Sequence, residues 1–134
     1  MGTEKVYCGT GGVAMDEKVI LAALEEIKVH ALKFTMSDVT RRLRMSKSSL
    51  YKLVDSKDKL ITAIVTYLIH EFKRKEQVLL QGNESPRQKI MGLVQLYTQM
   101  FQGMDNGVYG DLRCSYEAEW QRWSDFRAET VNHV

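Results

Sequence analysis

Proline occurs only once in this 134-residue chain, at Pro86. Proline interrupts helices because it lacks an amide proton and its ring clashes with the preceding turn, so its near absence leaves long segments free to be helical. Within these segments apolar residues recur at three- and four-residue intervals, and no alternating strand pattern stands out. We therefore predict an all-α fold.

Residues that cap helices precede the periodic segments and set their expected starts. Asp, Ser and Thr side chains accept hydrogen bonds from the first free amides of a helix. The expected caps are Asp16, Thr35, Ser46, Ser56 and Ser85. The fourth helix is expected to end near Leu80 and the fifth near Met104, with a stop at residues 105–107 and a final helical segment from about Asp111. In the first helix we expect Glu25, Glu26 and Lys28 to face solvent.

Composition restricts the class of protein. Hydrophobic residues make up 44% of the chain and charged residues 27%, as in ordinary globular proteins. The sequence has no apolar run of about 18 residues and no apolar secretion signal at its start, so we expect a cytoplasmic protein without a membrane segment. Cys8 and Cys114 lack metal-type spacing and are expected to be free thiols. Residues 1–15 show no helical period and are expected to form a flexible arm.

The charge is unevenly distributed along the chain. Residues 41–59 contain seven basic and two acidic residues, whereas the whole chain has a net charge of only +2. A compact basic patch on a mildly acidic body is typical of proteins that bind a polyanion. A solvated basic helix face would explain the charge equally well. The pattern of the surrounding residues therefore has to distinguish a polyanion-binding patch from a solvated helix face.

The spacing within residues 36–54 fits a helix-turn-helix. Two short helices must be locked by apolar residues at fixed offsets so that one of them can enter the major groove. We expect five side chains to form this lock: Val39, Leu43, Met45, Leu50 and Leu53. The opposite face of the second helix then carries Lys47, Ser48, Ser49 and Lys52. These side chains suit phosphates and base edges.

The sequence around this unit resembles the N-terminal domain of the tetracycline-repressor (TetR) family. Thr35 corresponds to the Thr that starts the family's second helix, and residues 46–51 and 56–60 match its Ser, Leu-Tyr and Ser-Lys-x-x-Leu positions. The similarity covers about residues 17–62. It departs at Arg44, where the turn usually has glycine, and at residues 53–54, which replace an aromatic pair.

The resemblance implies a DNA-binding role for specific positions. Thr35 and Lys57 would contact phosphates, and Lys47, Ser48 and Ser49 would face the groove. The full set expected at DNA is Thr35, Arg44, Lys47, Ser48, Ser49, Tyr51, Lys52 and Lys57. The implied function is a ligand-responsive repressor that binds a pseudo-palindromic operator as a homodimer. The family resemblance divides the chain into a DNA-binding domain at residues 16–60 and a helical effector-binding and dimerisation domain at residues 61–134, which we expect to be incomplete.

The second half has no diagnostic motif of its own. Its aromatic residues and one methionine could line a cavity for an apolar small-molecule effector, or they could simply pack between helices. The residues of this set are Tyr67, Tyr97, Met100, Phe101, Tyr116, Trp120 and Trp123.

Other functions find less support in the sequence. The three histidines, His30, His70 and His133, are scattered, so we predict no metal site. No phosphate loop, nucleophile motif or carboxylate pair is present, and we expect neither an enzyme nor a cofactor. The alternative function is a helical protein-interaction module whose basic segment binds an acidic partner.

Overall fold

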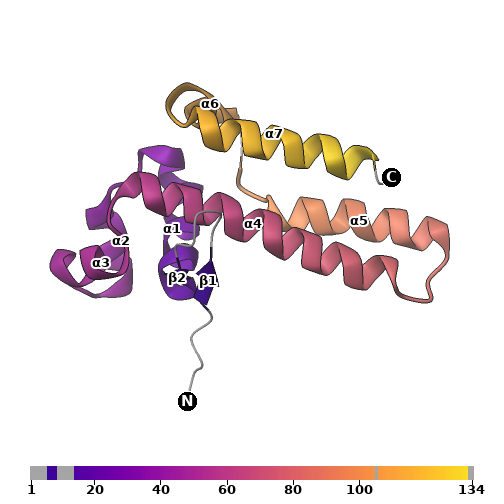
Figure 1. Ribbon diagram of the computed structural model, residues 1–134, viewed down its shortest axis with the longest axis horizontal. Helices are drawn as coiled ribbons and strands as arrows, with labels where there is room; N and C mark the ends of the chain where they lie inside the picture. The colour runs from indigo at the N-terminus through magenta and orange to yellow at the C-terminus, as the bar shows by residue number, and fades with distance from the viewer. Residues whose placement is uncertain (1–5, 9–13, 105, 133–134) are drawn as a thin grey trace, which may run out of the picture.

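The structure is a computed structural model that describes residues 6–8, 14–104 and 106–132, and most of these residues are helical (Figure 1). The predicted all-α class is confirmed. In chain order the elements are β1 (Val6–Cys8), β2 (Ala14–Asp16), α1 (Glu17–His30), the 3-10 helix η1 (Ala31–Lys33), α2 (Met36–Leu43), α3 (Lys47–Leu53), α4 (Lys57–Leu80), α5 (Pro86–Met100), α6 (Asn106–Ser115) and α7 (Glu117–Asn132).

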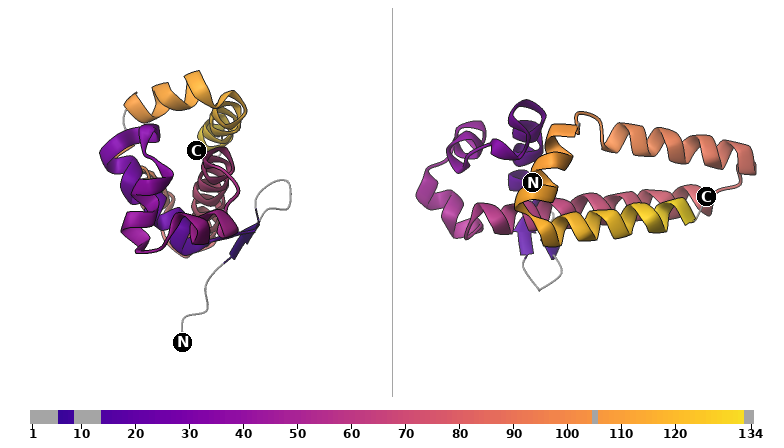
Figure 2. Two further views of the ribbon diagram at one scale, coloured as in Figure 1. Left: turned by 90° about the vertical axis from the view of Figure 1, so that its left-hand side faces the viewer. Right: turned by 90° about the horizontal axis from the view of Figure 1, so that it is seen from above.

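Helix α4 is the axis of the molecule. It contains 24 residues and is therefore about 36 Å long at 1.5 Å per residue. Helices α1, α2 and α3 gather around its N-terminal end, and α5 and α7 both lie along it (Figures 1 and 2). Viewed from above, α5 diverges from α4 and α7 as it approaches α6 (Figure 2). One helix thus connects the predicted DNA-binding unit to the rest of the chain.

All five predicted caps are confirmed. Each side-chain oxygen accepts a hydrogen bond from an amide in the first turn of its helix, which satisfies a donor that the helix itself cannot. The pairs of cap and amide are Asp16 with Lys18, Thr35 with Asp38, Ser46 with Ser49, Ser56 with Lys59 and Ser85 with Gln88. Pro86 occupies the start of α5, where a missing amide proton has no cost.

The N-terminal strands were not predicted. β1 and β2 pair antiparallel, with Val6 opposite Asp16 and Cys8 opposite Ala14. Strands of three residues are too short to show a two-residue period in the sequence. The expected arm without regular structure is therefore wrong for these residues, and its residues 1–5 and 9–13 lie outside the described part of the chain.

The C-terminal helices differ from the prediction in their bounds. Helix α5 ends at Met100 rather than near Met104, and Gly103 follows with φ of 85°, a value that favours glycine. Helix α6 begins at Asn106, five residues before the expected start, so residues 106–107 belong to a helix and not to the expected stop. Tyr116 then separates α6 from α7.

The core is continuous from the first helix to the last. Buried side chains of α1 and α2 join those of α4, α6 and α7 in one cluster, which includes Ile20, Val39, Ile61, Leu112 and Trp123. Glu26 is also buried, so its predicted solvent-facing position is wrong. It lies one turn beyond Ala23 on the inner face of α1, and the Nε atom of Arg42 donates to its Oε1 at 2.9 Å. Among the described helices, none has the length and apolar character needed to cross a membrane.

Candidate functional site

The candidate DNA-reading surface begins at the N-terminus of α2. The Asp38 amide donates to Thr35 Oγ1 at 3.1 Å, and the Thr35 amide donates to Asp38 Oδ2 at 2.8 Å. This reciprocal pair is a capping box, and it fixes the backbone at the entry to the helix. Hydrogen bonds from the backbone and side chain of Thr35 hold the pKa of the Asp38 carboxyl below its usual value. Thr35 remains exposed at this helix end.

The turn between α2 and α3 places a non-glycine residue in the left-handed region. Arg44 has φ of 56° and ψ of 44°. This left-handed conformation favours glycine, the residue that the resembled TetR pattern usually has at this position. The Met45 amide donates to Thr40 O at 3.1 Å and closes the turn. A side chain in this conformation costs about 1 kcal/mol relative to glycine. Arg44 is exposed beside the start of α3.

Helix α3 is anchored to the core through Leu50. Leu50 and Val39 are both fully buried in the same core cluster, while Leu43 and Met45 pack at its edge. Leu53 is 42% exposed, so its predicted place in the lock is wrong. The helix ends at Leu53 and the chain becomes extended at Val54, which turns the Val54 side chain inward instead.

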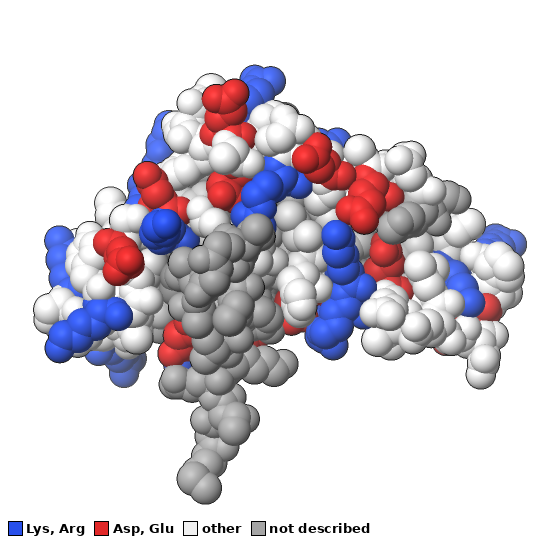
Figure 3. Space-filling view, in the orientation of Figure 1, with Lys and Arg blue, Asp and Glu red and all other residues white. Residues whose placement is uncertain are grey.

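The outer face of α3 carries the predicted groove-facing residues together. Lys47, Ser48, Ser49, Tyr51 and Lys52 are all exposed on this one helix. The Ser46 hydroxyl donates to Ser49 Oγ at 2.9 Å and lies 3.1 Å from Ser48 Oγ, so the serines form a small polar cluster at the start of the helix. Lys and Arg side chains gather at the α2–α3 end of the molecule (Figure 3). The outer face of α3 therefore carries positive charge and hydroxyl groups, and Leu50 on the opposite side anchors the helix to the core.

Lys57 has a different environment from the other predicted DNA-binding residues. Its ammonium donates to Leu32 O and lies 4.6 Å from the centre of the Phe34 ring. Burial lowers the pKa of Lys57, and the charges of Asp111, Asp58 and Asp38 partly oppose this effect. Lys57 thus joins the start of α4 to η1 within the protein.

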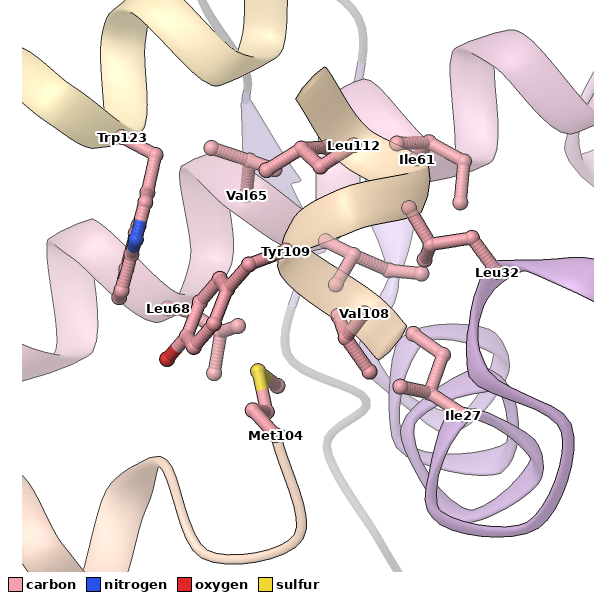
Figure 4. Close-up of a pocket in the computed structure, with 11 residues that line it drawn as sticks. Ile27, Leu32, Ile61, Val65, Leu68, Met104, Val108, Tyr109, Leu112 and Trp123 are labelled. Atoms are coloured by element: carbon pink, nitrogen blue, oxygen red, sulfur yellow. The ribbon is translucent and has the colours of Figure 1, made fainter. Parts of the chain in front are cut away.

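The residues expected to line an effector pocket do not share one cavity. Trp123 lines an apolar cavity between α1, α4, α6 and α7, whereas Tyr97 lines a groove between α5 and α7 (Figure 4). Met100 borders a separate hollow next to α1. Phe101 is buried among aromatic rings, with its ring centre 4.7 Å from that of Trp123. The remaining three, Tyr67, Tyr116 and Trp120, pack at the edge of the core.

The two cavities differ in size and openness. The cavity near Trp123 has a volume of about 30 Å³, room for about one or two water molecules, and its lining is apolar. The groove between α5 and α7 has about 290 Å³ and is floored by Phe72 and Leu93, with Arg127 and Thr130 at its rim. Of these two, the groove is the one whose volume approaches that of a small-molecule site.

A polar network that the sequence analysis missed joins α7 to α4. Thr62 Oγ1 donates to Glu119 Oε1 at 2.9 Å, and Arg122 Nη1 donates to Glu119 Oε2 at 2.7 Å. Arg122 Nη2 then donates to Thr66 Oγ1 at 2.6 Å. The i, i+3 spacing of Glu119 and Arg122 indicates a pair, but nothing in the sequence shows that this pair faces α4.

A second missed feature lies at the junction of α1 and α2. Glu26 and His30 are four residues apart on α1, so they share a face, and Asp38 of α2 approaches them. The prediction of no metal site rested on the scattered positions of the three histidines and did not take into account the four-residue spacing of Glu26 and His30.

Comparison with known proteins gives one informative similarity. The chain is 29% identical over 108 residues to the uncharacterized HTH-type transcriptional regulator YvaF of Bacillus subtilis (strain 168). The match covers 79% of this chain and 56% of that protein, so the chain spans little more than half of its relative's length. No family model matches the chain. The chain is thus similar to a protein described as a helix-turn-helix regulator.

Proposed function

We propose that this chain is a DNA-binding transcriptional regulator of the TetR type. The observation that carries the proposal is the outer face of α3, where Lys47, Ser48, Ser49 and Lys52 are exposed on a helix anchored by buried Leu50. The similarity to an HTH-type transcriptional regulator supports it independently. In this proposal α3 enters the major groove, with serine and lysine side chains at base edges and phosphates.

The neighbouring residues would position the protein on the backbone of the duplex. The exposed N-terminus of α2 at Thr35 presents amides and a hydroxyl to an anion, and the helix dipole favours negative charge there. Arg44, in the turn before α3, and Tyr51, on α3 itself, are also exposed. Lys57 would instead act by holding η1 against α4, since its ammonium is engaged inside the protein.

The regulator would act as a dimer that responds to a small molecule. Two α3 helices about 34–36 Å apart would read successive major grooves of a pseudo-palindrome. Exposed apolar side chains on α5, including Met91 and Val94, support a protein contact on that helix. An apolar effector in the groove between α5 and α7 would shift α4, to which both helices are packed, and so change the spacing of the α3 pair.

Duplex DNA binding measured against salt tests the proposal. Affinity for a random duplex should fall steeply from 50 to 200 mM salt, as expected when cations on the protein replace counterions. Lys47→Ala should weaken binding and reduce the slope of log affinity against log salt by about 0.9, the value for one phosphate contact. Lys75→Ala, an exposed lysine on the far part of α4, is the control and should bind as the parent does.

Two outcomes would contradict the proposal. Flat salt dependence or no binding at 50 mM salt would favour the alternative function, an interaction module for an acidic protein partner. Equal losses in Lys47→Ala and Lys75→Ala would mean that α3 is not the reading helix. Light scattering tests the dimer separately: a strict monomer at high micromolar concentration would remove the paired-groove mechanism while leaving DNA binding in place.

A further inference from the structure

We propose that Glu26, His30 and Asp38 form a site for a divalent transition-metal ion. One ligating atom of each side chain lies within 4.8 Å of the other two. Glu26 and His30 come from the last turns of α1, and Asp38 comes from the first turn of α2. The three residues therefore converge from two elements across a short connection.

Each carboxylate has one oxygen in a short hydrogen bond to the protein and a second oxygen with a longer contact. Glu26 Oε1 accepts from Arg42 Nε at 2.9 Å, whereas Glu26 Oε2 lies 3.7 Å from His30 Nε2. Asp38 Oδ2 accepts from the Thr35 amide at 2.8 Å, and its Oδ1 has only a 3.5 Å contact with Arg41. Hydrogen bonds to the outer oxygen of a ligating carboxylate orient the group and are typical of metal sites.

The donor set fits a borderline divalent ion. One imidazole nitrogen with two carboxylate oxygens suits Zn²⁺ and its neighbours, and bonds of about 2.0–2.2 Å require the three atoms to move closer together. His30 can supply this movement because its side chain is 47% exposed, while Glu26 and Asp38 are mostly buried. The nearby guanidinium groups are that of Arg42, which pairs with Glu26, and that of Arg41, which contacts Asp38 at 3.5 Å.

A bound ion would tie the end of α1 to the capping box of α2. Asp38 is the member of that box that bonds to the Thr35 amide, so an ion at Asp38 Oδ1 would sit next to the exposed N-terminus of α2. The ion would cross-link the strained connection between the helices, where Ala31 has φ of 54°.

Calorimetric titration of Zn²⁺ into metal-stripped protein without a histidine tag tests the site. We expect one ion per chain, and at least about tenfold weaker binding in His30→Ala. Asp38→Asn and Glu26→Gln should weaken binding similarly, although each keeps an oxygen that can accept the existing hydrogen bond from Thr35 or Arg42. Unchanged melting curves in EDTA would show that His30→Ala, which replaces a half-exposed residue, folds as the parent does.

Matched controls separate this site from other Zn²⁺ ligands. His70→Ala and Cys114→Ser replace a histidine and an exposed thiol outside the cluster, and both should bind Zn²⁺ with parental affinity. In the parent, Zn²⁺ should shift the imidazole nitrogen resonances of His30 and leave those of His70 in place. Parental affinity in His30→Ala, or no single-site binding by the parent, would overturn the proposal.

The effect of the ion on DNA rests on the proposed function and has a separate readout. Zn²⁺ should change duplex affinity in the parent and have no effect in His30→Ala. If Zn²⁺ binds at the cluster but no duplex binds at low salt, the metal site stands and the proposed function fails. If duplex binds but the cluster takes no Zn²⁺, the reverse holds.

Discussion

The helices before α4 and the helices after it use their apolar residues differently. In α3 the one fully buried side chain is Leu50, and most of the remaining surface is hydroxyl and lysine groups. In α5 the buried side chain is Leu93, but Met91 and Val94 are more than 60% exposed. Helix α7 is held to α4 by a polar network as well as by apolar packing. Helix α3 thus exposes mostly polar groups, with Tyr51 and Leu53 each less than half exposed, whereas α5 exposes strongly apolar side chains.

This difference bears on how the two regions would work. A helix whose outward groups are mostly polar can enter an aqueous groove while burying little apolar surface. Exposed apolar residues on α5, next to an open groove, are typical of a surface that contacts a ligand or another protein. Four mutational comparisons test whether the two regions differ in this way.

Leu50→Ala should have the largest effect. Removal of this buried side chain leaves a cavity between α3 and the core and should reduce the free energy of unfolding by about 2–5 kcal/mol. Leu53→Ala, three residues away on the exposed side, should change it by less than about 0.5 kcal/mol. Chemical denaturation of both variants gives the two values. Equal losses would place Leu53 in the core after all.

Glu119→Ala tests the polar contact between α7 and α4. It removes the acceptor for Thr62 and Arg122 in a part-buried network and should cost about 1–3 kcal/mol. Val94→Ser on α5 should cost little, because that side chain is 62% exposed. Thermal melts compare the variants. A Glu119→Ala protein as stable as the parent would mean that apolar packing alone holds α7.

Backbone strain should respond in opposite directions in the two regions. Arg44→Gly removes the side chain from a residue in the left-handed backbone region, which relieves the strain there and should stabilise the protein by about 1 kcal/mol. Gly103→Ala creates the same conflict at φ of 85°, with the added Cβ 3.1 Å from Lys28 Cγ, and should destabilise by at least a similar amount. Urea denaturation curves would show the two shifts. A loss of stability in Arg44→Gly would indicate that the arginine side chain contributes contacts that outweigh the strain.

The Asp38 carboxylate should produce the smallest effect, visible as a dependence on pH. Its pKa is lower in the folded state because Thr35 donates to it, so the folded chain favours the ionised form. The resulting stability is present above the unfolded-state pKa of about 3.9 and is lost as pH falls through the folded-state value. In EDTA, the stability difference between parent and Asp38→Asn should therefore shrink as the solution is acidified. A constant difference across that range would show that ionisation of Asp38 does not matter.

The local fold of the first region could be read from the sequence, and the arrangement of the second could not. Caps such as Ser46 and Ser56 act within one helical turn, so the pattern of nearby residues is enough to place them. Leu53 was misplaced because a helix end changes the direction of the next side chain, and the sequence does not mark that end within one residue.

Contacts between distant residues explain the other differences. Glu26 is buried because Arg42, sixteen residues later, pairs with it, and Lys57 turns inward because Leu32 O lies within reach. The predicted effector residues were chosen by type, but which cavity each one faces depends on how α5, α6 and α7 cross α4. Periodicity contains no information about those crossings.

The central claim is that α3, and not the α5 surface, lies against the duplex. Photo-cross-linking tests it directly, with a benzophenone amino acid placed either at exposed Ser48 on α3 or at exposed Gln95 on α5. With labelled duplex DNA at low salt, the protein substituted at position 48 should form a covalent adduct that disappears at high salt, and the protein substituted at position 95 should form none. Adducts at position 95 with none at position 48 would contradict the account.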